Sequence, residues 1–361
     1  MPASSLVAAL LYCRPGFEKE CAAEISEQAA ALGVHGYAKA RPDSGYVLHV
    51  AHDPADIALL AQELRFQDLV FARQLIYCRS RIDGLPATDR VAPLVAAVKP
   101  LAAAFSQVWL ETADTNEAKE LSGFCRKFAP HLERALERAG CLRRGRADAP
   151  RLHLFFLDSS SCYAGLSFPG NSSPWPMGIP RLRIPRAAPS RSAAKLVEAF
   201  HTLMSEEERS ARLKPGMGAV DLGAAPGGWS WYLASRGLRV TAVDNGPMDK
   251  ALLAGGLVEQ VKTDGFTFRP QRPVDWLVCD MVEQPVRIAA LVGQWLARGW
   301  CRAAVFNLKL PMNKRYEEVK RCRTAIDQQL RVRGVDAELR MKQLYHDREE
   351  VTGYLQRLRV E

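Results

Sequence analysis

One stretch in the second half of the chain constrains the fold more than any other, residues 219–230 with the sequence AVDLGAAPGGWS. Its apolar start, AVDL, suits a parallel strand that is buried on both faces. The glycines that follow, Gly223, Gly227 and Gly228, let the backbone turn sharply and approach a ligand with no Cβ in the way. Residues 229–235 then begin a helix, whose first turn has backbone N–H groups without partners. The stretch therefore predicts a strand, a ligand-binding turn and a helix in series.

Two acids follow this turn, each at the end of an apolar segment. Asp244 closes the segment LRVTAVD, and Asp264 closes GLVEQVKTD. An acid about 20 residues beyond a glycine turn, at the tip of the next strand, commonly accepts hydrogen bonds from the ribose of a nucleoside. The turn and the two acids together favour a nucleoside cofactor over a purely structural turn.

Two other nucleotide-binding motifs fit the turn poorly. It reads GAAPGG, with a proline where the fingerprint of the NAD enzymes needs compact spacing, and no Gly-Lys-Ser/Thr of a P-loop follows. The turn resembles instead the first motif of the S-adenosylmethionine-dependent methyltransferases. This resemblance implies that the turn holds the methionine end of the cofactor, that Asp244 binds the ribose and that Asp264 lies by the adenine.

The length and composition indicate a folded protein of more than one domain. With 361 residues, 48% of them hydrophobic, the chain can form two or three domains with proper cores. No apolar run approaches the roughly 20 residues of a membrane span, and the start MPASSLVAALLYCRPG lacks the features of a signal peptide. We therefore expect a soluble cytoplasmic protein.

Cysteine and histidine usage suggests neither disulfides nor a metal site. The nine cysteines include no Cys-x-x-Cys pair, and His49 and His52 stand alone. Reduced, mostly buried thiols are the expected state, and no metal is predicted.

The formal charge is +9, from 49 Lys plus Arg against 40 Asp plus Glu, which favours a polyanionic partner although ordinary proteins also reach this excess. One basic cluster occupies 15 residues without any acid: Arg181, Arg183, Arg186, Arg191 and Lys195. Two further clusters are Arg134, Arg138, Arg143, Arg144, Arg146 and Arg151, and Lys314, Arg315, Lys320, Arg321 and Arg323. Solvated helix faces could explain the last two clusters, but hardly the first.

Four segments are expected along the chain: 1–77, 78–168, a proline-rich linker at 169–189 that marks a domain boundary, and 190–361. In the first, strands at 6–14, 45–51 and 66–77 with helices at 16–32 and 53–64 indicate a small α+β unit. In the second we expect helices at 91–104 and 118–139 and strands at 107–111, 151–157 and 162–167.

Pro130 must kink or split the helix at 118–139. This arginine-rich helix and the loop after it could be purely structural or could follow a phosphate backbone. The sequence leaves these two readings open.

The last segment predicts a doubly wound, mostly parallel α/β sheet with ligands at the carboxyl ends of its strands. A helix begins near Ser190, with Ser190 or Ser192 as its cap, and buries Ala194, Leu196, Val197 and Phe200. Strands at 274–280 and 301–309, a helix at 316–332 and strands around 337–344 and 351–360 complete the expected order.

Four polar residues would gather at this edge: Lys195, Asp280, Lys309 and Glu350. Each alone could simply be solvated. Together, in the contexts SRSAAKL, VCD, NLK and REEV, they resemble the Lys-Asp-Lys-Glu tetrad of ribose 2′-O-methyltransferases of the heat-shock ribosomal RNA methyltransferase type. The choice of Glu350 over Glu349 depends only on the following Val351.

Methyl transfer to a ribose hydroxyl needs alignment and a proton acceptor. Lys309 is the expected base, with a pKa lowered by partial burial and by the neighbouring cation Lys195. Asp280 and Glu350 would hold the lysines and the hydroxyl.

Two rival chemistries lack their motifs. Amino-group methyltransferases need Asn/Asp-Pro-Pro-aromatic where this chain has Asp280-Met281-Val282-Glu283, and cytosine C5 enzymes need a nucleophilic thiol. Cys279 lies inside the expected strand and is more readily a core residue.

The whole layout resembles the bacterial 23S ribosomal RNA cytidine ribose 2′-O-methyltransferase M family, with a two-part N-terminal RNA-binding module of the THUMP kind. DLGAAPGGW and APSRSAAKL are the specific matches, and Ala225 replaces a cysteine that family members often have. The implied partner is 23S ribosomal RNA, modified at one cytidine of the peptidyl transferase region, with no membrane and no obligate protein partner. The residues implied to bind the cofactor are Ser190, Asp221, Gly223, Ala225, Pro226, Gly227, Gly228, Trp229, Asp244, Asp264 and Asp280.

Two alternatives stay open. The chain could be an RNA-binding ribosome-assembly protein whose methyltransferase fold is catalytically silent, or a methyltransferase that acts on another RNA.

Overall fold

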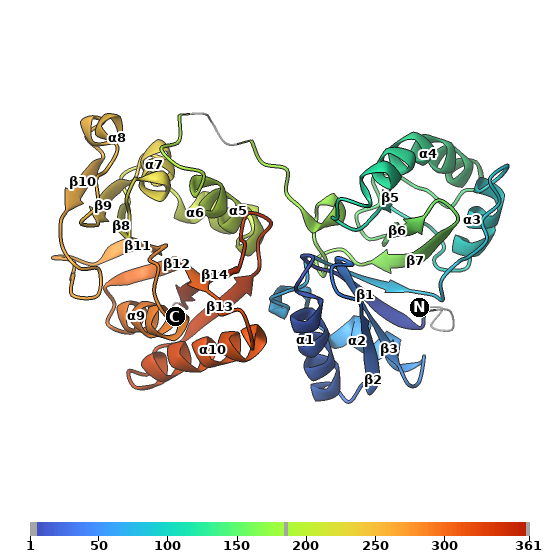
Figure 1. The fold of residues 1–361 in the computed structure, drawn as a ribbon, viewed down its shortest axis with the longest axis horizontal. Helices are drawn as coiled ribbons and strands as arrows, with labels where there is room; N and C mark the ends of the chain where they lie inside the picture. Colours follow the sequence, from blue (N-terminus) through green and yellow to red (C-terminus); the bar gives the residue numbers. More distant parts are fainter. Residues whose placement is uncertain (1–5, 184–186, 359–361) are drawn as a thin grey trace. The chain divides into compact units, whose positions relative to one another are not determined.

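The computed structural model describes residues 6–183 and 187–358. The chain divides into two compact units, Met1–Ile179 and Pro180–Glu361 (Figure 1). Arg186 and the end of the strand expected at 351–360 lie outside the described residues.

The first unit contains one seven-stranded sheet in the order β2-β3-β1-β4-β7-β6-β5. Only β5 and β6 are parallel among its neighbours. The strands are β1 (Ala8–Tyr12), β2 (Gly36–Ala40), β3 (Tyr46–Ala51), β4 (Gln74–Cys78), β5 (Val108–Glu111), β6 (Arg151–Asp158) and β7 (Ser161–Ser167). The helices are α1 (Glu18–Ala31), α2 (Asp56–Glu63), α3 (Val91–Val98) and α4 (Lys119–Arg138).

This unit differs from the sequence-based expectation in four places. Strand β2 was not predicted, because GYAKA is mostly exposed and lacks an apolar alternation. Strand β4 begins at Gln74, since the predicted segment 66–77 opens with the short 3-10 helix Phe66–Asp68. Helix α3 ends at Val98, two residues before Pro100, whose ring disfavours helix in the residue before it. Helix α4 is continuous, so Pro130 does not split it.

Strands β4 and β7 join the two halves of the first unit. Tyr77 pairs with Leu166 and Cys78 with Gly165, so a single sheet runs from residue 8 to residue 167. The division of this unit into two domains at residue 77 stays a prediction.

The second unit contains a seven-stranded sheet in the order β10-β9-β8-β11-β12-β14-β13. Its strands are β8 (Gly218–Leu222), β9 (Arg239–Val243), β10 (Val258–Val261), β11 (Val274–Cys279), β12 (Cys301–Lys309), β13 (Ala337–Lys342) and β14 (Glu350–Arg357). All neighbours are parallel except β14, which runs antiparallel to both β12 and β13. The predicted doubly wound, mostly parallel α/β sheet is confirmed.

Helices cover both faces of this sheet. Figure 1 shows α5, α6 and α7 on one side and α9 and α10 on the other. Their bounds are α5 (Ala193–Leu203), α6 (Glu206–Arg212), α7 (Gly228–Ser235), α8 (Lys250–Ala254), α9 (Pro285–Ala297) and α10 (Arg315–Arg331). Helix α6 was not predicted, although Ser205 and Glu208 form the capping box that its S-x-x-E sequence indicates.

One core cluster of the second unit lies between the sheet and the helices α5 and α7. The side of α5 expected to be buried is buried, including Leu196 and Phe200. The Phe200 ring packs edge-on against Trp276 of β11, and Trp276 stacks on Tyr354 of β14. These aromatic contacts hold α5 across the strands that carry the polar residues singled out above.

The nine cysteines are all free and buried, which confirms the expected reduced, buried thiols. The imidazole nitrogens of His49 are buried without a hydrogen-bond partner among the described residues. No described helix combines the length and the apolar character that crossing a membrane requires.

Gly353 in β14 allows β12 and β14 to pack closely. A Cβ at this position would lie 2.4 Å from Cζ of Phe306, which is fully buried. We expect Gly353→Ala to lower the free energy of unfolding of the second unit by about 1–3 kcal/mol, because the buried ring must shift. Urea unfolding followed by circular dichroism measures this change.

Gly218→Ala is the matched control, because its Cβ would meet the nearest atom, Val274 Cγ1, at an ordinary 3.7 Å. Equal losses in the two variants would show that close packing at Gly353 is not the constraint.

Candidate active site

The site is built by the register of two antiparallel strands. Lys309 of β12 lies opposite Glu350 of β14, and Asn307 lies opposite Thr352. Residues two apart in a strand point to the same face, so these four side chains share one face. Asp280 directly follows β11, which runs beside β12. The carboxyl ends of β11 and β12 therefore bring polar side chains to one edge of the sheet.

The structure brings together all four residues of the expected tetrad. The Lys309 Nζ atom lies 2.5 Å from Asp280 Oδ1 and 3.0 Å from Glu350 Oε1. Lys195, in the first turn of α5, forms an ion pair with Glu350 Oε2. All four side chains are between 15% and 22% exposed, so they are partly shielded yet reachable. Two cations and two carboxylates make a compact cluster without net charge.

Glu349 is not part of this cluster. Its side chain is 57% exposed and pairs with Arg315 at the start of α10, whereas Glu350 contacts both lysines. Between the two acids that the sequence could not separate, the geometry favours Glu350.

The sequence analysis expected partial burial and the neighbouring Lys195 to lower the pKa of Lys309, and this expectation is wrong for this structure. Burial by itself would lower the pKa of Lys309, but the charges and hydrogen bonds of Asp280 and Glu350 outweigh burial and raise it above its ordinary value. Lys195 pairs with the carboxylate of Glu350 rather than acting as an uncompensated neighbouring cation. Lys309 is therefore an ammonium group in the free protein.

Three buried residues support the cluster, and the sequence analysis missed them. Asn307 Nδ2 lies 3.0 Å from Asp280 Oδ1, and its Oδ1 accepts from the Thr352 hydroxyl at 2.7 Å. The Thr352 hydroxyl also lies 3.0 Å from Oδ2 of Asp347. The only signal in the sequence is that Asn307 and Thr352 sit two residues from Lys309 and Glu350.

The glycine turn has the conformation that its residues require. Gly223 and Gly227 have φ values of 77° and 118°, in the region that favours glycine, and Gly227 is the N-cap of α7. A Cβ on Gly228 would lie 2.2 Å from Ser190 Oγ, so the segment before α5 packs directly on the start of α7. Ser192 is the N-cap position of α5, although its side chain makes no capping bond.

Asp244 fastens the turn to the next strand. Its carboxylate accepts hydrogen bonds from the backbone N–H of Ala225 at 3.0 Å and of Gly246 at 2.7 Å. Ala225 is partly buried and Pro226, which follows it through a cis peptide bond, is exposed. Asp244 is partly exposed and keeps lone pairs for a further donor.

Asp221 and Trp229 lie deeper. Asp221 accepts from the Ser230 hydroxyl at 2.7 Å, and its Oδ1 is buried without a hydrogen-bond partner in the described structure. Burial raises the pKa of Asp221 to about 7, in spite of the Ser230 hydrogen bond. The Trp229 ring is 2% exposed and donates from Nε1 to Ser192 O, so its side chain joins α7 to the segment before α5.

Asp264 is exposed and lies three residues beyond the end of β10. Its carboxylate accepts from Phe266 N at 2.8 Å, which shapes its own turn. Met281, which the sequence analysis did not select, packs against both turns. A Cβ on Gly223 would lie 2.7 Å from Met281 Cγ, and one on Gly265 would lie 2.7 Å from Met281 Sδ.

Cys279 is fully buried, and burial raises the pKa of its thiol to about 12. It is a core residue, as expected.

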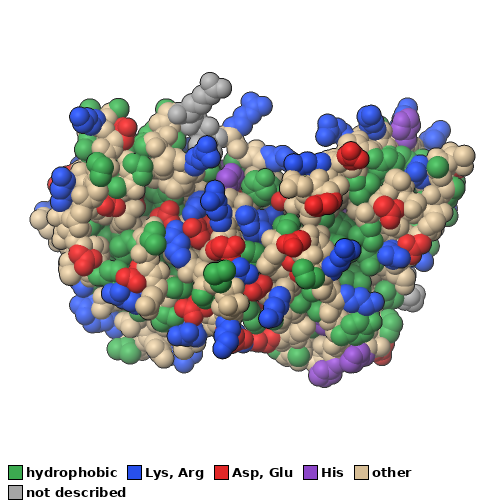
Figure 2. All heavy atoms as spheres, viewed as in Figure 1, with side chains coloured by type: hydrophobic (Ala, Val, Ile, Leu, Met, Phe, Trp, Pro, Cys, Tyr) green, Lys and Arg blue, Asp and Glu red, His purple; other side chains and the backbone are tan. Residues whose placement is uncertain are grey.

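The basic clusters differ in how many of their positive charges form ion pairs with acidic side chains. Arg144 pairs with Glu133 and Glu137, and Arg321 pairs with Glu318. On the face seen in Figure 2, Lys and Arg side chains are interspersed with Asp and Glu. Arg181, Arg183 and Arg191, in contrast, are exposed and have no ion pair with any residue that the structure describes.

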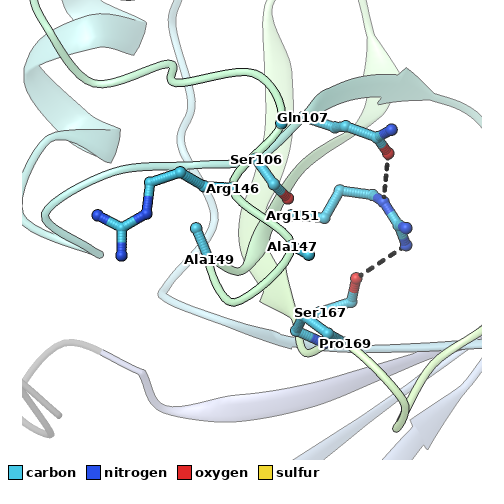
Figure 3. Close-up of a pocket in the computed structure, with 9 residues that line it drawn as sticks. Ser106, Gln107, Arg146, Ala147, Ala149, Arg151, Ser167 and Pro169 are labelled. Carbon is cyan, nitrogen blue, oxygen red and sulfur yellow. Dashed lines mark hydrogen bonds between the residues drawn. The ribbon is translucent and has the colours of Figure 1, made fainter.

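A cavity of about 240 Å³ lies in the first unit (Figure 3). Arg151 at its wall is held by Gln107 and Ser167 and stacks over Trp109, 3.8 Å from the ring centroid. Arg146 pairs with Asp148. These partners engage both arginines.

Comparison with known families covers most of the chain. The models described as RlmM ferredoxin-like domain, Ribosomal RNA large subunit methyltransferase M, N-terminal, and FtsJ-like methyltransferase match residues 6–76, 89–168 and 188–359.

Curated relatives named Ribosomal RNA large subunit methyltransferase M are similar over nearly their full length. The protein from Methylococcus capsulatus is 58% identical over 96% of this chain and 97% of its own, and that from Aromatoleum aromaticum is 54% identical over 96% and 94%. A solved structure, TrmN from Thermus thermophilus, is 17% identical over 98% of this chain and all of its own, with a TM-score of 0.38.

The raised pKa of Lys309 can be tested directly. We expect Asp280→Asn to lower the pKa of Lys309, because it removes the carboxylate nearest to Nζ. Titration of isotope-labelled lysine side chains by NMR measures the change. Glu349→Gln, outside the cluster, serves as the control, and an equal shift in both variants would contradict the assignment.

Proposed function

The chain belongs to the ribosomal RNA large subunit methyltransferase M family, and on that premise we propose how its active site works. The protein is an S-adenosylmethionine-dependent ribosomal RNA methyltransferase. In our proposal, the methyl group is transferred to a ribose 2′-hydroxyl, and the residues that catalyse the transfer are Lys195, Asp280, Lys309 and Glu350. The observation that carries it is the contact of Lys309 with both carboxylates at the carboxyl edge of the sheet.

The glycine turn fits the cofactor. Asp221 Oδ1, buried without a partner among the described residues, is an acceptor suited to an amino group, and the partly exposed carboxylate of Asp244 suits ribose hydroxyls. The first turn of α7 offers backbone N–H groups to a carboxylate. Ser190, Gly223, Ala225, Pro226, Gly227, Gly228, Trp229 and Asp264 complete the proposed binding residues.

When bound, the cofactor supplies a methyl group that is already activated on a positively charged sulfur. The chain therefore has to align the ribose hydroxyl and remove its proton. Asp280 and Glu350 are the acceptors that can orient the hydroxyl, because both carboxylates are partly exposed and lie beside Lys309. Lys195 holds Glu350 in place.

Lys309 is the proposed base. Because its pKa is raised in the free protein, it must first lose a proton to solvent. A ribose hydroxyl that binds Asp280 and Glu350 competes for the oxygens that now hold the Lys309 ammonium group, which weakens the contacts that raise its pKa. As the ribose oxygen takes the methyl group, its proton passes to neutral Nζ.

The proposed substrate is one cytidine in the peptidyl transferase region of 23S ribosomal RNA, modified in the cytoplasm. The family resemblance supports this choice. We further propose that residues 1–77 and 78–168 form the two-part THUMP-type module that captures RNA, that 169–189 is the linker and that 190–361 is the catalytic domain. Arg181, Arg183 and Arg191, which have no ion pair with a described residue, could contact phosphates beside the helix that carries Lys195.

Replacing Lys309 tests the base. We expect Lys309→Ala to lower the turnover of methyl transfer to ribosomal RNA from cells lacking the enzyme by about two to four orders of magnitude. Lys309→Arg should be no better, because a guanidinium group does not give up its proton. Substantial transfer by the arginine variant would exclude Lys309 as the base.

Cofactor binding by calorimetry supplies the control. Asp244→Ala should weaken S-adenosylmethionine binding, since the ribose loses its acceptor, whereas Lys309→Ala should leave it nearly unchanged. Equal losses would contradict the separate roles. A wild-type protein that binds the cofactor and RNA but transfers no methyl group would support the catalytically silent alternative.

The exposed arginines in the linker and just after it allow a second test. Changing Arg181, Arg183 and Arg191 to Gln should weaken binding of a ribosomal RNA fragment and flatten its log-log salt dependence by roughly one unit or less for each phosphate that is no longer neutralised. Cofactor affinity should persist. Arg321→Gln, whose partner Glu318 already balances its charge, is the control, and an equal effect there would refute a specific role for these arginines.

A further inference from the structure

We propose that Asn307, Thr352 and Asp347 form a buried hydrogen-bond relay that positions the two active-site carboxylates, and that it functions while Asp347 is protonated. The relay deepens the proposed function and rests on it. The three side chains are positioning residues, because each acts through another residue and none is exposed: Asn307 and Thr352 have no exposed surface and Asp347 has 1%.

The Asn307 amide lies between the two carboxylates. Its Nδ2 atom is 3.0 Å from Asp280 Oδ1 and 3.4 Å from Glu350 Oε2. An amide nitrogen carries two N–H groups, so it can bridge two groups of like charge that would otherwise repel each other. This contact requires the amide oxygen to point the other way, toward Thr352.

The direction of the next hydrogen bond follows from the chemistry of the amide. Asn307 Oδ1 can only accept, so the Thr352 hydroxyl, at 2.7 Å, must donate to it. That uses the single hydroxyl proton of Thr352. Its lone pairs are then directed at Asp347, whose Oδ1 and Oδ2 lie at 3.2 and 3.0 Å.

If Asp347 were ionised, its lone pairs would face those of the Thr352 hydroxyl, and no hydrogen bond could form between the two side chains. A protonated Asp347 carboxyl can donate a hydrogen bond to Thr352. Leu344 N already donates to Oδ2 at 3.0 Å, which leaves Oδ1 as the oxygen to carry the proton. The relay is then complete from Asp347 through Thr352 and Asn307 to the two active-site carboxylates.

The surroundings of Asp347 agree with this assignment. Burial raises the pKa of Asp347 well above its ordinary value, and the negative charges of Glu350 and Glu198 add to the increase, whereas the Leu344 N–H and Lys195 oppose it. His346, the neighbouring titratable group, is bound to Glu198 through Nδ1 at 2.6 Å.

Ionisation of Asp347 would reverse the relay. The Thr352 hydroxyl would turn to the new carboxylate, and Asn307 Oδ1 would lose its donor. A buried acceptor without a donor is costly, so the amide would no longer be fixed between Asp280 and Glu350. The carboxylates would then hold Lys309 and the ribose hydroxyl less well.

Two variants of Thr352 separate the hydroxyl from the volume of the side chain. We expect Thr352→Val to lower the single-turnover rate of methyl transfer about tenfold to a hundredfold at saturating RNA and cofactor. This change in rate corresponds to the free-energy cost of leaving one buried acceptor, Asn307 Oδ1, without a donor. Thr352→Ser, which keeps the hydroxyl, should recover most of the rate. If the valine variant transfers methyl groups as fast as the serine variant, the relay is wrong.

The pH dependence tests the proton on Asp347. In Asp347→Asn, the amide donates to Thr352 at every pH, so the ratio of its rate to the wild-type rate should increase as the wild-type carboxyl ionises. Dividing by the wild-type rate removes the part of the Lys309 titration that the two proteins share. A ratio that stays constant through the pH range in which the NMR signal of the Asp347 carboxyl carbon shows it ionising would overturn the requirement for a proton.

One readout does not depend on catalysis. NMR of asparagine-labelled protein should show a shifted Asn307 side-chain amide in Thr352→Val and a nearly native one in Thr352→Ser. An unchanged amide in the valine variant would overturn the relay even if the enzyme is active. A wild-type protein without methyl transfer would instead overturn the proposed function, while the amide signals still decide on the relay.

Discussion

The antiparallel pairing of β12 with β14 is the constraint on which the active site depends. It places Lys309 opposite Glu350 and Asn307 opposite Thr352 on one face of the sheet. A slip of one residue would send the polar side chains to the opposite face, where Leu308 and Val351 are now fully buried. The contact of the Phe306 ring with Gly353 opposes such a slip, because a residue with a Cβ atom in the place of Gly353 would collide with the ring. The register of β12 with β14 therefore determines which side chains lie together in the candidate active site.

Two groups of cations in the second unit differ in how far nearby acids balance their charge. Lys195 and Lys309 are partly buried and balanced by Asp280 and Glu350, so they attract no distant anion strongly. Arg181, Arg183 and Arg191 are exposed and unbalanced among the described residues. In the proposed mechanism, the cations that would attract RNA are therefore different residues from the cations that would take part in the chemistry. The overall excess of nine positive charges did not distinguish these two groups.

Much of the second unit could be predicted from the sequence because its signals are local. The glycine turn, the strand ends at Asp280 and Lys309 and the apolar side of α5 each depend on a few neighbouring residues. The direction of the pKa shift of Lys309 could not be predicted, since it depends on distances between side chains 29 and 41 positions apart. Asp347 was missed for the same reason: within YHDREE it looks like a surface acid, and only the fold buries it.

The place of β14 in the sheet has a consequence for how the molecule is assembled. This strand lies between β12 and β13, although it follows both in the chain. Until it inserts, one edge of β12 stays unpaired and Lys309 lacks Glu350, whereas β8, β9 and the glycine turn can already form from nearer segments. Pairing between distant segments is slow because the loop must close before the pairing can stabilise it. In the proposed mechanism, a folding intermediate with a formed glycine turn would therefore be unable to carry out proton transfer. Insertion of β14 alone would cover the unpaired edge of β12 and complete the proposed active site.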